Sequence, residues 1–229
     1  VFPLGWKSQE GISSGYREKG FFPEAVVNFL ALLGWNDGTE KELYSLEELV
    51  EAFDLNRVHK AGAKFDPEKN KWFNHQYLIK QNDADLAKSF SPILVEKGVD
   101  ISKYDVTRIV SLIKERAHFV SEFWDLTDFF FQAPTSYDEK ASKNWKEETP
   151  ALMQELISTL EYIDGFDSAN IEAIVKDWLT KNEIGMGKVM QPFRLSLVGA
   201  LKGPHLFDIV EIIGKEETIS RIQKAIATL

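Results

Sequence analysis

The chain has 229 residues, 44% hydrophobic and 28% charged, which is the composition of a folded globular protein and excludes a disordered one. It contains no cysteine, which excludes disulfides, cysteine-ligated zinc and a thiol nucleophile. Its formal net charge of −9 excludes nucleic-acid binding driven by overall charge, so any such contact must come from a local group of basic residues.

The beginning of the chain has few regular signals. Residues 1–22 contain four glycines and predict irregular structure with a short helix, and a minor β element is allowed only there or at 53–65. Pro23 then opens a helix that Gly34 ends. The apolar residues of this helix recur at helical spacing: Val26, Phe29, Leu30 and Leu33.

Two further helices are predicted before residue 80. Ser45 and Glu48 form a capping box for the first of them. Its apolar positions predict a buried face made of Leu46, Leu49, Val50 and Phe53. Residues 60–65 predict a loop, and Asp66 followed by Pro67 predicts the start of the next helix.

Beyond residue 80 every predicted element is a helix. Asn82 is an N-cap, Gly98 ends that helix, and an apolar stripe predicts another helix over 103–116. The segment 132–136 is the best candidate for a linker. Later helices are predicted at 139–147, 150–163, 168–182, 207–213 and after Gly214. The fold class predicted from these patterns is mainly α.

The segment 187–207, GKVMQPFRLSLVGALKGPHLF, stands out in an acidic chain. It carries Lys188, Arg194 and Lys202 and no Asp or Glu, and Gly199, Gly203 and Pro204 interrupt it. The pattern predicts an amphipathic helix followed by a turn that presents a guanidinium and free backbone amides. Such a surface suits a polar, planar, partly anionic ligand. A basic helix packed in an ordinary helical domain has the same spacing, and this alternative stays open.

No motif of catalysis or metal binding is present. The four histidines are scattered and form no closely spaced pair: His59, His75, His118 and His205. No glycine-rich phosphate loop follows a strand, and no serine lies in a nucleophile-like setting. We therefore expect no catalytic site and no metal site in this sequence.

Two stretches, at 15–35 and 53–78, read GYREKGFFPEAVVNFLALLGW and FDLNRVHKAGAKFDPEKNKWFNHQYL. Together they resemble the stretch that follows the catalytic fold in bacterial glutamyl-tRNA synthetases. The segment 187–207 resembles the motif at the anticodon end, with Phe193 where leucine is usual and Val198 where threonine is usual. The blocks occur in the family's order across nearly the whole chain, so the resemblance is specific.

The resemblance implies a mainly α fold in three parts. These are a stem-contact domain at 1–80, which touches the inner side of the tRNA's L, and two helical subdomains of an anticodon-binding domain at 81–132 and 133–229. The implied partner is tRNA(Glu). The family's catalytic signatures are not found, so its ATP- and Mg-dependent attachment of glutamate to tRNA is expected to lie in an N-terminal catalytic domain outside this sequence. No cofactor is expected in this part.

Five residues match the positions that bind the anticodon in this family. Arg194 matches an anticodon-contacting arginine, and Arg116 falls where the reader of the third anticodon base lies. Gly203, Pro204 and Leu206 match the positions that cradle the anticodon, with Gly203 in place of the usual threonine. A planar guanidinium can engage the adjacent acceptors O2 and N3 of cytosine together. In this family an arginine at the position of Arg116 accompanies enzymes that accept only glutamate tRNA.

A second group of residues is expected to contact the tRNA backbone. Phosphate contacts fix register without reading sequence. The candidates are the basic residues Arg17, Arg57, Lys60, Lys64 and Lys188.

A different class of function stays open: a non-catalytic helical scaffold that binds protein partners through its Phe- and Ile-rich faces. For either function we expect a monomer in the cytoplasm. No apolar run approaches the roughly 18 residues of a membrane span, and Val1 is followed by no signal-peptide pattern.

Overall fold

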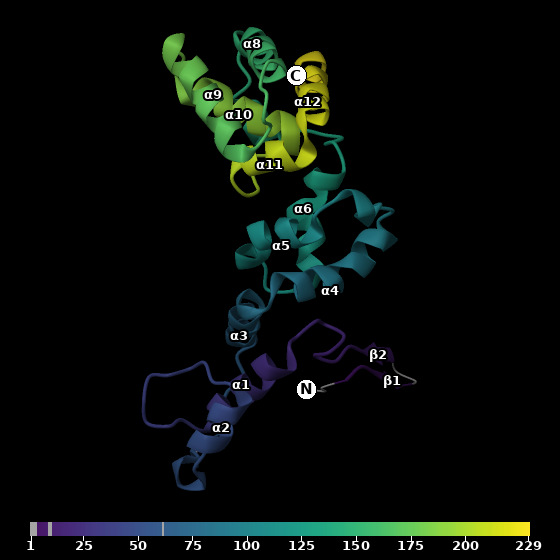
Figure 1. Ribbon diagram of the computed structural model, residues 1–229. Helices are drawn as coiled ribbons and strands as arrows, with labels where there is room; N and C mark the ends of the chain where they lie inside the picture. Colours follow the sequence, from purple (N-terminus) through teal and green to yellow (C-terminus); the bar gives the residue numbers. More distant parts are fainter. Residues whose placement is uncertain (1–3, 9–10, 61) are drawn as a thin grey trace. The chain divides into compact units, whose positions relative to one another are not determined.

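The computed structural model describes residues 4–8, 11–60 and 62–229, and almost all of their regular elements are helices (Figure 1). The predicted mainly α class is confirmed. The chain divides into two compact units, Val1–Leu126 and Thr127–Leu229, called here the first and second unit. The division falls inside helix α6 (Phe123–Phe131).

The first unit begins with a small hairpin. Strand β1 (Trp6–Ser8) pairs antiparallel with β2 (Gly11–Ser13), and a single bridge joins Trp35 to Val58. The hairpin and Val58 lie in the two regions where the sequence allowed a minor β element, whereas Trp35 lies outside them. The short helix expected within 1–22 is absent from the described part of that segment. One turn closes between Lys19 N and Gly15 O at 3.1 Å, and Gly20, at φ +81°, ends it.

Helices α1 (Pro23–Gly34) and α3 (Pro67–Lys80) form the core of the first part of this unit. Their buried contacts join Ala25, Phe29 and Phe73. Both helices begin with the predicted proline, and the side chain of Asp66 caps α3 by accepting from two backbone N–H groups.

Helix α2 (Leu46–Ala52) has the predicted capping box, because Ser45 and Glu48 bond to each other's backbone N–H. Its predicted buried face is wrong except at Leu49, which is 6% exposed. The other three residues are exposed: Leu46, Val50 and Phe53. The helix has only seven residues, and one row of them packs against Trp35 and Tyr44, so Leu46 and Val50 face outwards. Phe53 follows the helix, and its exposed ring still lies 5.7 Å from that of Trp35.

The rest of the first unit is built around two antiparallel helical segments joined by short 3₁₀ turns. Helix α5 begins at Val106, later than predicted, because Asp105 caps it by accepting from Arg108 N at 3.0 Å. The buried apolar residues include Phe90, Ile109, Val110 and Phe123. The elements of this part are α4 (Asp83–Glu96), η2 (Ile101–Lys103), α5 (Val106–Ile113), η3 (Lys114–Arg116) and η4 (Val120–Glu122). A further 3₁₀ turn, η1 (Leu55–Arg57), lies between α2 and α3.

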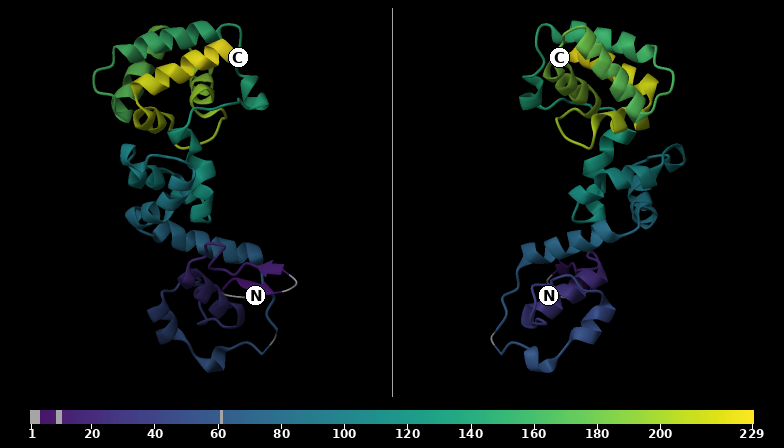
Figure 2. Two further views of the ribbon diagram at one scale, coloured as in Figure 1. Left: turned by 90° about the vertical axis from the view of Figure 1, so that its right-hand side faces the viewer. Right: turned by 60° about the vertical axis from the view of Figure 1, so that its left-hand side comes forward.

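The second unit is a bundle in which α10 packs against α7, α8 and α12, while α9 packs against α11. In Figure 2 the yellow C-terminal helix α12 lies beside α8. The face of α10 that points into the bundle is closely packed, with Val189, Phe193 and Leu197 fully buried. The helices are α7 (Glu139–Ser142), α8 (Thr149–Glu161), α9 (Ser168–Lys181), α10 (Met186–Val198), α11 (Leu206–Ile213) and α12 (Lys215–Thr228).

A buried arginine ties the second unit together. Arg221, on α12, is 3% exposed, and its Nη1 donates to the carbonyls of Phe129 at 2.6 Å and Leu197 at 2.9 Å. Its Nε donates to Glu217 at 2.7 Å. The guanidinium therefore joins α12 to the end of α6 and the end of α10.

None of the helices in the described ranges has the length and apolar character needed to cross a bilayer.

Candidate nucleic-acid interface

The turn that follows α10 depends on two glycines with left-handed backbone conformations. Gly199 ends the helix at φ +77°, and Gly203 has φ +99°. A Cβ built at Gly203 would lie 3.1 Å from the ring of Phe129. A threonine at this position would combine an unfavourable φ with that close contact, so the local backbone accounts for the glycine that stands where the synthetase family usually has threonine.

Arg194 holds this turn against α10. Its Nη1 donates to the carbonyl of Lys202 at 3.0 Å and to that of Pro204 at 2.8 Å. The side chain is half-buried. Because two carbonyls hold Nη1, the plane of the guanidinium has a defined orientation before any ligand arrives.

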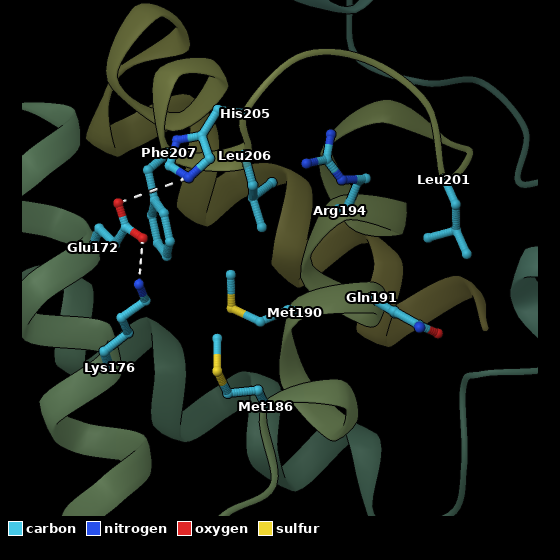
Figure 3. A pocket seen from close by; sticks show the side chains of 10 residues that line it. All are labelled: Glu172, Lys176, Met186, Met190, Gln191, Arg194, Leu201, His205, Leu206 and Phe207. Atoms are coloured by element: carbon cyan, nitrogen blue, oxygen red, sulfur yellow. Dashed lines mark ion pairs between the residues drawn. The ribbon is translucent and has the colours of Figure 1, made fainter.

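Beside Arg194 lies a cavity of about 380 Å³ between α9, α10 and the start of α11. Figure 3 shows Met186, Met190 and Leu206 in its middle, with Arg194 on one side and Glu172 on the other. The remaining lining residues are Lys176, Gln191, Leu201, His205 and Phe207. The cavity thus has an apolar floor and polar groups on opposite walls.

The wall opposite Arg194 carries paired charges. Lys176 Nζ lies 2.6 Å from Glu172 Oε1, and His205 Nε2 lies 3.7 Å from Glu172 Oε2. Nδ1 of the same histidine lies 3.8 Å from Asp208. The hydrogen bond from Lys176, with a smaller contribution from His205, lowers the pKa of Glu172. This wall therefore offers carboxylate acceptors, whereas Arg194 offers donors.

Four of the predicted anticodon residues come together at this turn. Arg194 and Leu206 line the cavity, and Pro204 supplies a carbonyl that orients Arg194. Leu206 is 3% exposed, Pro204 is buried and Gly203 is half-buried. Lys188 is exposed on the same helix, 3.5 Å from Glu148, and does not line the cavity.

The fifth predicted residue belongs to the first unit. Arg116 is the last residue of η3, directly after α5, and its side chain is exposed. The other predicted backbone contacts of this unit are also exposed: Arg17, Arg57, Lys60 and Lys64. Lys60 and Lys64 lie in the predicted loop, of which residue 61 is outside the described residues.

Several lining residues were not named as site residues from the sequence. Met186 with Met190, and Glu172 with Lys176, are each four residues apart, which places each pair on one helix face. That spacing was a usable signal. The meeting of the two faces depends on how α9 and α10 pack, which no local pattern encodes.

Within the described ranges, no group of three or more histidine or carboxylate side chains could hold a metal ion.

Two family models match the sequence. The model described as "Anticodon binding domain" matches residues 84–226, and the model "tRNA synthetases class I (E and Q), catalytic domain" matches residues 7–72. The first range includes Arg116 and the whole cavity beside Arg194.

The chain is also similar to whole proteins and solved structures. It is 88% identical to a glutamate–tRNA ligase of Flavobacterium johnsoniae and 71% identical to one of Flavobacterium psychrophilum, covering 100% of this chain and 46% of each relative. A crystal structure of a glutamate tRNA ligase from Elizabethkingia meningosepticum in complex with its amino acid matches with a TM-score of 0.94 and 48% identity, again over 100% of this chain and 46% of that one. The chain therefore spans about half the length of the relatives it matches.

Proposed function

Since the chain belongs to the anticodon binding domain family, we propose that it is the tRNA-recognition part of a glutamate–tRNA ligase and that its cavity beside Arg194 receives anticodon bases of tRNA(Glu). The observation that carries the proposal is the guanidinium of Arg194, held by two carbonyls at the edge of an apolar cavity. The bases of a single-stranded loop are splayed out, so their Watson–Crick edges reach such a group.

The chemistry of the cavity suits a base. Its volume of about 380 Å³ lies in the usual range for small-ligand pockets. The side chains of Met186, Met190 and Leu206 offer apolar contact to a base face, and Arg194 offers a planar pair of donors to a base edge. A net charge of −9 makes this local arrangement more important than overall attraction to the RNA phosphates.

A binding experiment tests the proposal. The full chain is titrated with an anticodon stem-loop of glutamate tRNA and with a matched stem-loop of an unrelated anticodon, at several salt concentrations. We expect tighter binding of the first and a falling affinity with salt. Equal affinity for both stem-loops would contradict anticodon recognition.

We further propose that Arg116 reads the third anticodon base, a cytosine in glutamate tRNA. Guanine at that position would present N1–H and N2–H donors to the guanidinium in place of acceptors. The parent enzyme would then discriminate against glutamine tRNA, whose anticodon ends in G. Arg17, Arg57, Lys60, Lys64 and Lys188 are proposed to contact phosphates, where they fix register.

The chemistry of the whole protein lies outside this sequence in our proposal. The parent would attach glutamate to tRNA with ATP and Mg²⁺, in the cytoplasm and as a monomer, through an N-terminal catalytic domain. This chain alone is expected to support no ATP–pyrophosphate exchange. Robust exchange by the purified chain would contradict that assignment.

An apolar surface on the first unit supports contact with a further domain of the same protein. Val27 and Leu30 on α1 are 43% and 48% exposed, and Val50 on α2 is 74% exposed. Apolar groups that gather in one large patch mark protein contacts, whereas scattered ones are ordinary on a protein surface. The alternative function, a helical scaffold for other proteins, would use the same surface but predicts no preference among tRNA stem-loops, so the titration above separates the two.

A further inference from the structure

A second cavity, of about 510 Å³, lies within the first unit and contains none of the proposed anticodon residues. Four aromatic rings line it, from Tyr16, Phe21, Phe65 and Phe119, and all four are half-buried. Asn70 on α3 also lines it. The other lining residues are Glu18, Lys19, Pro67, Lys71 and Ser121.

Asn70 is the unusual member of this set. It is 1% exposed, yet its Oδ1 has no hydrogen-bond partner among the described residues. A buried polar atom without a partner costs about 1–3 kcal/mol, and such atoms are rare in native proteins.

Asn74, one turn further along α3, provides the contrast. It is fully buried, but its Oδ1 accepts from Phe22 N–H at 2.8 Å and its Nδ2 donates to the carbonyl of His118 at 2.6 Å. The fold therefore uses the amide of Asn74 in hydrogen bonds and, in the described part of the chain, leaves the Oδ1 of Asn70 without one, on a residue that lines the cavity.

The aromatic rings are arranged as a platform. The rings of Tyr16 and Phe65 are near-parallel, at 22° with centroids 6.4 Å apart. Phe21 meets Tyr16 edge-on at 5.0 Å and Phe119 at 4.8 Å. Flat aromatic surfaces of this kind bind planar rings, and nucleic-acid bases stack on them whatever their sequence.

Two ammonium groups are present among the lining residues. Lys19 is exposed, and Lys71 lies 3.0 Å from Glu68 in an exposed pair that contributes little. The one carboxylate of the lining, Glu18, accepts from the backbone N–H of Gly15 at 2.9 Å. The lining therefore offers an anionic group on a ligand two cations against one carboxylate, and a backbone hydrogen bond holds that carboxylate in place.

We propose that this cavity binds a single unstacked nucleotide. The base packs against the rings of Tyr16 and Phe65, its edge bonds to the amide of Asn70, and its phosphate lies near Lys19 and Lys71. A side-chain amide pairs with an adjacent donor and acceptor, and the N6 amino group and N7 of adenine provide this pair. The nucleotide has two chemical sources, a free nucleoside monophosphate or an unpaired nucleotide within an RNA. The proposal uses no anticodon-binding residue and stands independently of the proposed function.

The test uses the full chain, labelled with ¹⁵N on backbone and side-chain amides and ¹³C on aromatic rings. It is titrated with AMP, adenosine, ribose 5-phosphate and a short single-stranded oligoadenylate, and NMR shifts are followed at Asn70, Tyr16 and Phe65. AMP is expected to shift all three sites, and ribose 5-phosphate, which lacks a base, none of them. A response to AMP without one to the oligoadenylate identifies a free nucleotide as the source, and a response to both identifies RNA.

Three variants complete the test. Asn70→Leu is expected to weaken AMP binding by about tenfold or more while leaving Tm unchanged or higher, because it removes an unsatisfied polar atom and keeps the branched shape of the side chain. Asn74→Leu, the matched control, is expected to lower Tm clearly, because it orphans the groups bonded to that amide. Lys71→Ala, at an exposed site, is expected to weaken AMP but not adenosine.

Two results would overturn the proposal: no response to AMP or to the oligoadenylate, or AMP binding unchanged in both Asn70→Leu and Lys71→Ala. Neither result would affect anticodon recognition, which is measured separately with the stem-loops and with Arg194→Ala.

Discussion

Replacing Arg194 by alanine tests two roles of one side chain. The guanidinium donates to the carbonyls of Lys202 and Pro204, so the substitution releases the turn between α10 and α11. It also removes the planar donor from the edge of the cavity. We therefore expect a loss of stability and a loss of RNA affinity that differ in size.

The stability loss follows from the two hydrogen bonds. A bond from a charged donor contributes about 1.5–3 kcal/mol when both groups are shielded. Here the side chain is half-buried, so water can replace part of each bond, and we expect a total of about 1–3 kcal/mol. At about 2–4 °C per kcal/mol for a chain of this size, Tm should fall by roughly 2–12 °C.

The affinity loss follows from the lost base contact. A bidentate contact to a base edge gives about 1–3 kcal/mol, which corresponds to roughly 5–150-fold in Kd. Fluorescence anisotropy with a labelled anticodon stem-loop, at fixed salt and well below Tm, measures it. Lys188→Ala is the control, because it removes one positive charge from the same helix. Its exposed pair with Glu148 contributes at most about 1 kcal/mol, and its loss should weaken all RNAs alike.

Arg194 does not contact the anticodon if Arg194→Ala binds the cognate stem-loop as tightly as the original chain does. Arg194 acts only as a charge if Arg194→Ala and Lys188→Ala lose the same factor for cognate and unrelated stem-loops.

The remaining predictions concern stability, pH and specificity. Gly199→Ala should cost clearly more than Gly98→Ala in urea unfolding, because both residues have positive φ but only the first meets a backbone oxygen, at 2.7 Å. Arg221→Met should cost about 3–5 kcal/mol, since it orphans two buried carbonyls. The lowered pKa of Glu172 stabilises the folded chain above the unfolded pKa of this carboxyl, and this stability is lost as pH falls through the folded pKa. The free energy of unfolding of Glu172→Gln should therefore depend less on pH in the acid range. Arg116→Gln in the full-length enzyme should narrow the kcat/KM ratio between glutamate and glutamine tRNA.

For each of these predictions, one outcome would contradict it. Equal losses at the two glycines would mean that the turn moves away from the added Cβ. A neutral Arg221→Met would mean that the freed carbonyls reach water. If the free energy of unfolding of Glu172→Gln depends on acid pH as that of the original chain does, Glu172 does not cause this dependence. An unchanged kcat/KM ratio would show that Arg116 does not read the third base.

Local signals in the sequence were enough to predict where most helices begin. Ser45 with Glu48, Asp66 with Pro67, and Asn82 all act within one helical turn, so a side chain and the backbone it caps are close in the chain. The position of Arg194 before the two glycines was equally readable, because the turn follows from Gly199 and Gly203 themselves.

Features that depend on packing could not be read in this way. Val50 and Leu49 are neighbours with the same apolar character, yet only Leu49 meets the ring of Trp35, and the sequence does not say which side of a seven-residue helix will be covered. The charge cluster at Glu172 arises because α9 packs beside α11, which brings a residue 33 positions away, His205, within 3.7 Å. The unsatisfied oxygen of Asn70 likewise becomes visible only when every neighbour is in place.

Arg116 and Arg194 have the same guanidinium group, but in the part of the chain that the structure describes only that of Arg194 is held in place before RNA binds. The folded chain already holds Arg194 through two carbonyls, so the entropy of ordering its side chain is lost on folding and not on binding. Arg116 is exposed at the end of a 3₁₀ turn, and among the described residues no hydrogen bond or ion pair fixes its guanidinium. Ordering it on binding costs about 0.5–1.5 kcal/mol, which offsets much of a 1–3 kcal/mol base contact. Arg194→Ala should therefore cause the larger loss of affinity. Arg116→Gln should act mainly on discrimination, because the ordering cost is the same for cytosine and guanine and cancels from their ratio.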